Sequence, residues 1–171
     1  MYPYLTPYGI IMKLNRQPLA GLDEDTLQRD HEFWRQFSDR LIGNWIDYDT
    51  TVKEICEFVD KVYIQRDMRG FRGDRKFIRD DNAQKAFSKL RSSIGGVYSW
   101  RLANARSPEE QQRMFREADF AFRQAFAHEA PIGTLWRFPE MVLVDWATGE
   151  TPEGAMALDP EILYFDEPSA G

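Results

Sequence analysis

The sequence predicts a mainly α fold: an antiparallel bundle, or a helical-repeat fragment, of about four helices followed by a short irregular or β tail. Three observations support this. Four segments before residue 128 repeat apolar residues every three or four positions, the period of one helix face. Each segment begins beside a residue that can cap a helix. The connections between them are short, which favours antiparallel neighbours.

We divide the chain into an extended N-terminal arm over 1–22, a helical domain over 23–130 and an acidic tail over 131–171. The first segment is punctuated by prolines, and its apolar run 8–14 fits either a short strand or an extended packing arm. We favour the arm, because a lone strand would have no partner nearby.

The first helix is expected over 24–45, with Asp23 as its N-cap. The second is expected over 52–67, where Thr51 and Glu54 have the spacing of a capping box. The residues expected to face the core are Leu27, Trp34, Phe37, Leu41 and Trp45 in the first helix, and Val52, Ile55, Val59, Val62 and Tyr63 in the second.

The third helix is expected over 82–105, capped by the sequence that starts at Asp81. The pair Gly95-Gly96 at its centre should mark a close helix approach or a kink rather than a break. The fourth helix, over 108–128, has the clearest start, with Ser107 as its cap and a proline in the first position. The expected core residues are Ala83, Phe87, Leu90, Ile94, Val97 and Leu102, then Phe115, Ala118, Phe122, Ala125 and Phe126.

The charge is unevenly distributed. The last 44 residues contain nine acidic residues and one basic residue, Arg137, whereas the first 127 contain 21 basic and 19 acidic residues. The net charge of −6 argues against a nucleic-acid binder. One cysteine excludes an intramolecular disulfide and a cysteine-rich zinc site. No apolar run is long enough to span a bilayer. We therefore expect a soluble chain without a cofactor or a bound metal.

Two residues could carry chemistry on their own. His31 lies between two carboxylates and could act as a general base, but no second histidine shares its face, so a partly exposed structural histidine is the favoured interpretation. Cys56 has acidic neighbours, which raise a thiol pKa, so we expect a buried structural cysteine. We assign no catalytic residue.

One segment is strongly basic. Residues 66–91 contain nine basic and four acidic residues, with Phe71 and Phe77 between them. Such a segment could bind phosphate, RNA or an anionic membrane surface, although a solvated loop would have the same composition. The candidate anion patch is Arg66, Arg69, Arg72, Arg75, Lys76 and Arg79.

The chain ends in a distinctive string, Ala155-Met-Ala-Leu-Asp-Pro160 followed by an apolar run and Asp166-Glu167. It resembles the Walker B end of an ABC-transporter ATPase. In that family the aspartate binds Mg²⁺ through water and the glutamate orients the attacking water. The sequence contains no phosphate-binding Gly-x-x-x-x-Gly-Lys-Ser/Thr motif. We therefore expect no ATP hydrolysis, and the change in charge near position 128 raises the alternative that 131–171 is of foreign origin.

The first 127 residues resemble the soluble C-terminal region of a bacterial membrane-protein family of unknown function that is likened to protein O-mannosyltransferases. The resemblance lies in residues 1–18, 29–34, 86–94 and 117–126. Soluble tails of that family often carry tetratricopeptide repeats, and Ala118, Phe122 and Ala125 match the spacing in the second helix of such a repeat.

This resemblance implies a non-catalytic helical segment, with an interaction or scaffold role, of a membrane glycosyltransferase-like protein. The chain would then be truncated or chimeric, because the catalytic membrane half is absent. Its partners would be another protein or that membrane half, with weak contact to an anionic surface and none to nucleic acid. A self-contained protein-interaction module and an enzyme with an unrecognised site remain the alternatives.

Overall fold

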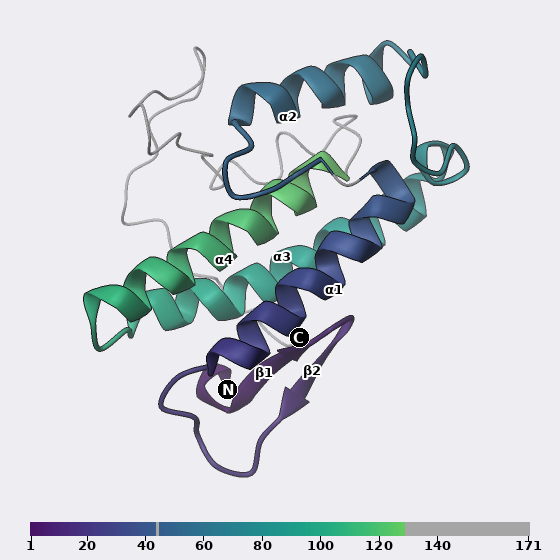
Figure 1. Cartoon of the computed structure of the whole chain (residues 1–171). Helices are drawn as coiled ribbons and strands as arrows, with labels where there is room; N and C mark the ends of the chain where they lie inside the picture. Colours follow the sequence, from purple (N-terminus) through teal and green to yellow (C-terminus); the bar gives the residue numbers. More distant parts are fainter. Residues whose placement is uncertain (44, 129–171) are drawn as a thin grey trace, which may run out of the picture.

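A computed structural model describes residues 1–43 and 45–128 (Figure 1). The mainly α class is confirmed. The short β tail expected over 131–171, with its ATPase-like end, lies outside the described residues. The elements, in order, are β1 (Leu5–Tyr8), β2 (Ile11–Leu14), α1 (Glu24–Ile42), α2 (Val52–Val59), α3 (Asp81–Ala103) and α4 (Pro108–Ala127), with short 3₁₀ turns at Tyr2–Tyr4 and Phe77–Arg79.

The N-terminal segment is a β-hairpin rather than an unpaired arm. β1 and β2 pair antiparallel from Leu5 opposite Leu14 to Tyr8 opposite Ile11. The chain reverses through Gly9, whose φ of 62° suits the first central position of a tight hairpin turn. The expected arm is wrong over 5–14, because the apolar run 8–14 contains both the turn and the partner strand.

The helix starts follow the local capping signals. Asp23, Thr51 and Ser107 each accept a hydrogen bond from the backbone three residues ahead, and Thr51 and Glu54 complete the capping box. α3 starts one residue earlier than expected, because Asp80 is the cap that accepts from the amides of residues 82 and 83.

Two helices end earlier than predicted. α1 stops at Ile42, where Gly43 takes a φ of 93°, so Trp45 lies beyond the helix and packs on Phe58. α2 ends at Val59 and continues as a π-helical turn, Asp60–Ile64. Arg66 follows with a φ of 56°, a left-handed conformation that a helix cannot contain.

α3 and α4 lie side by side and antiparallel, α1 crosses them, and α2 covers the far end of α4 (Figure 1). The centre of the hydrophobic core is formed by the fully buried side chains of Trp34, Ile55, Ile94 and Phe120. α4 presents small residues to it, with Met114 buried where Phe115 was expected. Phe115, Phe122 and Phe126 are only partly buried; Phe122 and Phe126 still pack against the core, as expected.

α3 runs unbroken through its glycine pair, so the expected close approach is confirmed. A Cβ on Gly95 would stand 2.9 Å from the Phe122 ring of α4, whereas a Cβ on Gly96 would meet nothing within 4 Å. Gly95 is therefore needed for packing, and Gly96 is not.

This contrast predicts opposite results for two otherwise identical substitutions. Gly96→Ala should raise the free energy of unfolding by about 0.5–1 kcal/mol through helix propensity. Gly95→Ala should lower it by about 1–3 kcal/mol, because the new methyl group overpacks the helix contact. Urea unfolding of both variants measures the difference, and equal effects would contradict the packing described.

Candidate functional site

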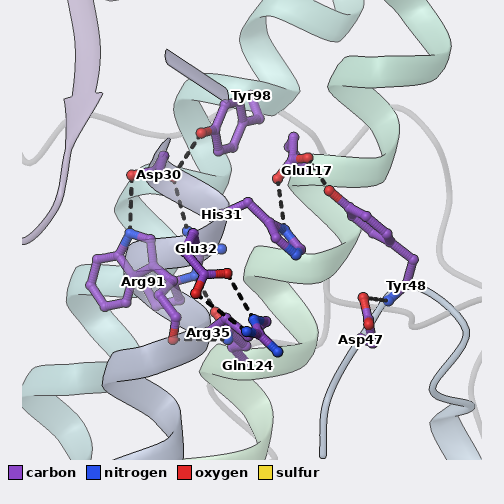
Figure 2. Close-up of polar contacts among 11 residues, drawn as sticks. Asp30, His31, Glu32, Arg35, Asp47, Tyr48, Arg91, Tyr98, Glu117 and Gln124 are labelled. Carbon is purple, nitrogen blue, oxygen red and sulfur yellow. Dashed lines mark hydrogen bonds and ion pairs between the residues drawn. The ribbon is translucent and has the colours of Figure 1, made fainter. Parts of the chain in front are cut away.

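A cluster of polar side chains lies buried between α1, α3 and α4 (Figure 2). Asp30 of α1 is 2% exposed and accepts hydrogen bonds from the indole of Trp34, at 3.2 Å, and from the hydroxyl of Tyr98, at 2.7 Å. Arg91 lies two turns before Tyr98 on α3, so both side chains reach the same place. Its Nη1 lies 3.8 Å from Asp30 Oδ2.

Arg91 is fully buried and held mainly by neutral partners. Its Nε donates to Oε1 of Gln124 at 2.7 Å, and its guanidinium carbon lies 4.8 Å from the Trp34 ring centre and 5.4 Å from that of Phe120. Neither Nη atom has a hydrogen-bond partner among the described residues. Arg91 belongs to the basic segment 66–91 in sequence, but the fold removes it from the surface.

Burial dominates the electrostatics of this pair. It raises the pKa of the Asp30 carboxyl above its ordinary value, and the charge of Arg91 and the hydrogen bond from Tyr98 only partly offset it. Burial also lowers the pKa of Arg91, against the attraction of Asp30. Arginine is nevertheless not deprotonated in proteins. The arrangement fixes three helices relative to one another and offers no exposed reacting atom.

His31 lies at the edge of this cluster and is partly exposed, as the favoured interpretation predicts. Its Nδ1 is 3.5 Å from Oε2 of Glu117, and its ring lies between Tyr48, at 4.6 Å, and Phe120, at 4.3 Å. The Tyr48 hydroxyl donates to the other carboxylate oxygen of Glu117. Burial, then this hydrogen bond, raise the pKa of Tyr48, so its phenol stays protonated at neutral pH.

A second histidine is buried at the end of α4. His128 stacks on Phe87 at 3.8 Å, its Nδ1 donates to the Gln124 carbonyl at 2.7 Å, and its Nε2 lies 3.3 Å from the Ser38 hydroxyl. Burial is the main cause that lowers the pKa of His128 to about 3, so the ring is neutral in the folded protein near pH 7.

Cys56 is exposed, so the expected buried cysteine is wrong. The core-facing residues of α2 are Val52, Ile55 and Val59. One residue further along a helix is about 100° further around it, which turns Cys56 away from the core. Partial shielding of the sulfur and the charge of Glu57 still raise its thiol pKa, so it is not an activated nucleophile.

The candidate anion patch lies in the basic loop, which we define as residues 66–79. This loop is anchored at both sides. Asp74 N donates to the Leu41 carbonyl at the end of α1, and Phe77 and Ile78 insert into the core. A Cβ on Gly73 would stand 2.2 Å from that carbonyl oxygen, so the contact requires glycine.

The six cations of the patch divide into two groups. Arg66 donates to the Ile78 carbonyl at 2.9 Å, and Arg69 forms an ion pair with Asp67 at 2.7 Å. The other four side chains are exposed and make no hydrogen bond or ion pair within the described part of the chain. They are Arg72, Arg75, Lys76 and Arg79.

The two aromatic residues of this loop are not presented to solvent. Phe77 is buried in the core, and Phe71 is half-buried beside Phe58. Recognition of single-stranded nucleic acid relies on exposed aromatic rings that stack on bases. The loop therefore offers charge without a stacking surface.

A hollow of about 310 Å³ lies elsewhere, bordered by Pro3 and residues 18–20 on one side and by the end of α3 and the start of α4 on the other. Arg101 borders this hollow but has a structural role, because its Nη2 donates a hydrogen bond to the Leu5 carbonyl at 3.1 Å. Trp100 stacks on Tyr2 at the rim. These contacts fasten the hairpin to α3.

Among residues 1–43 and 45–128, no helix has the length and apolarity to cross a membrane, and no group of three or more His, Cys, Asp or Glu side chains could hold a metal ion. Comparison with protein-family models, curated proteins and solved structures finds no match to this chain.

Proposed function

We propose that the chain is a non-catalytic helical interaction segment that binds an acidic protein surface through its basic loop. The observation that carries the proposal is the group of four exposed cations in that loop. Neighbouring Arg69 is neutralised by Asp67, whereas these four have no partner among the described residues. Exposed like charges on a fixed loop repel one another and are relieved by a partner of opposite charge.

The buried polar cluster supports a role without catalysis. Asp30, Arg91 and His128 have the side chains of catalytic groups, but each is almost fully enclosed and bound to its neighbours. His31, which is partly exposed, is held by Glu117 and by ring stacking. The hollow beside Arg101 is lined by none of these residues.

Within a larger protein, this segment would be the soluble part of a membrane glycosyltransferase-like protein, as its resemblance implies. The catalytic groups would then belong to the membrane half, and the basic loop would contact an acidic partner. This assignment rests on the sequence resemblance of residues 1–127 and on the helical fold.

Reversing the charge of the loop tests the function. The triple change Arg72→Glu, Arg75→Glu and Lys76→Glu should weaken binding of a fluorescein-labelled polyglutamate peptide at least about tenfold at low salt. Fluorescence anisotropy measures the affinity. Moderate salt should weaken the binding of the peptide to the unaltered protein, because salt screens surface charges.

The matched control carries the same change in net charge elsewhere. Arg29, Lys53 and Arg106 are exposed on other elements, and replacing all three by Glu should leave most of the affinity. Equal losses in the two triple variants would show that net charge, and not the basic loop, attracts the peptide. Absence of peptide binding by the unaltered protein would reject the proposed function.

A further inference from the structure

The first 14 residues, which contain the β-hairpin, carry most of the large apolar side chains that the described residues leave exposed. Eight such side chains are exposed in this part of the chain, and six lie within residues 1–14. A seventh, Phe33 of α1, lies under the turn, with its ring 3.2 Å from the position of a Cβ on Gly9. The six are Met1, Tyr4, Tyr8, Ile10, Ile11 and Leu14.

The exposure follows from how the hairpin is held. β1 is the inner strand: it contacts α1 and α3, it buries Leu5 and Pro7, and Arg101 binds its backbone. β2 is the outer strand, and only Met12 of its four residues packs against the core. The turn at Gly9-Ile10 therefore projects beside α1, away from α3 and α4 (Figure 1).

The charge of the hairpin has one sign. Residues 1–22 contain Lys13 and Arg16 and no Asp or Glu. Two acidic residues on the adjoining helix are already paired, since Glu24 binds Arg113 and Glu32 binds Arg35, each within 3 Å. Exposed aliphatic side chains, a tyrosine and flanking cations together are the chemistry that suits the boundary between an anionic headgroup layer and its acyl chains.

We propose that the tip of the hairpin, Tyr8 to Ile11, docks onto the interface of an anionic lipid bilayer. Ile10 and Ile11 enter the acyl boundary, the Tyr8 ring stays at headgroup level, and Lys13 and Arg16 contact the lipid phosphates and carboxylates. The surface is separate from the basic loop, which rests on the other end of α1 at Leu41. The inference therefore does not depend on the proposed function.

A second copy of the chain is the competing occupant, through the free edge of β2. That edge is four residues long and has Lys13 within it, and a short, charged edge opposes strand pairing. Two such strands would also bury far less than the roughly 1,200 Å² of a stable interface. The lipid surface is the better fit.

Vesicle co-sedimentation of the full chain tests the proposal, with phosphatidylcholine vesicles that contain or lack phosphatidylserine. The double change Ile10→Ser and Ile11→Ser should reduce binding to the anionic vesicles about tenfold. The matched control is Ile64→Ser, because Ile64 is 57% exposed and Ile11 is 59% exposed, but Ile64 lies outside the hairpin. This control should bind as the unaltered protein does.

Two charge variants separate the surfaces. Lys13→Glu with Arg16→Glu should remove the preference for phosphatidylserine, and the triple Glu variant of the basic loop should keep it. Loss of vesicle binding in the loop variant alone, or no vesicle binding by the unaltered protein, would overturn the proposal. So would a dimer in analytical ultracentrifugation that the Ile10 and Ile11 changes dissolve while lipid binding is unchanged. Near-ultraviolet circular dichroism checks that each variant is folded.

Discussion

Replacing Arg91 by Met should lower the free energy of unfolding by about 3–5 kcal/mol, the loss expected when one partner of a buried ion pair is removed. The change leaves the Asp30 carboxyl enclosed without its counter-charge and deprives Gln124 of its donor. Urea denaturation followed by tryptophan fluorescence measures the loss, since Trp34 lies against the guanidinium.

The exposed pair Arg69–Asp67 is the control for this experiment. Its shortest distance, 2.7 Å, is less than the 3.8 Å between Arg91 and Asp30. Arg69→Met should nevertheless cost less than about 1 kcal/mol, because solvent screens an exposed pair. Arg91→Met combined with Asp30→Leu should recover part of the loss, since no buried charge remains. Similar effects at Arg91 and Arg69 would contradict the buried cluster.

Acid should destabilise the fold through His128. Its pKa is about 3 in the folded chain and 6.5 as the ordinary value, so the unfolded state binds the proton first. The stability that neutral His128 contributes is present above pH 6.5 and is lost progressively as pH falls toward 3. Between pH 7 and pH 5 the loss should be about 2 kcal/mol, because one pKa unit corresponds to about 1.4 kcal/mol.

Unfolding in urea at pH 7, 6 and 5 tests this dependence while most carboxylates are still ionised. The unaltered protein should lose stability steadily over this range, and His128→Asn should start less stable but change less with pH. If the free energy of unfolding fell equally with pH in both proteins, groups other than His128 would cause the acid sensitivity.

Local signals predicted the helices well because caps and apolar spacing act within a few residues. Asp23, Thr51 and Ser107 all start helices as expected. The hairpin was missed because the apolar run 8–14 contains the turn and β2 but only the last residue of β1, and Pro7 within β1 makes the partner strand hard to recognise in the sequence. The end of α2 was missed because nothing in the sequence marks Arg66 as left-handed.

The buried polar cluster could not be predicted for a different reason. Asp30, Arg91 and Gln124 are residue types normally found at the surface. Their contacts between helices join positions 33 to 90 residues apart, which no local pattern connects. The basic segment 66–91 was found by composition, but only the structure separates its exposed cations from Arg69, which is paired, and from Arg91, which is buried.

We expect the helical part of this chain to be by itself a stable unit that binds an acidic partner. Expressing residues 1–130 tests it most directly, by thermal unfolding in circular dichroism and by polyglutamate binding on the same sample. We expect one cooperative transition, the helical signal of the described helices, and the affinity of the full chain. A gradual melt, a loss of helix relative to the full chain, or loss of peptide binding would contradict the account.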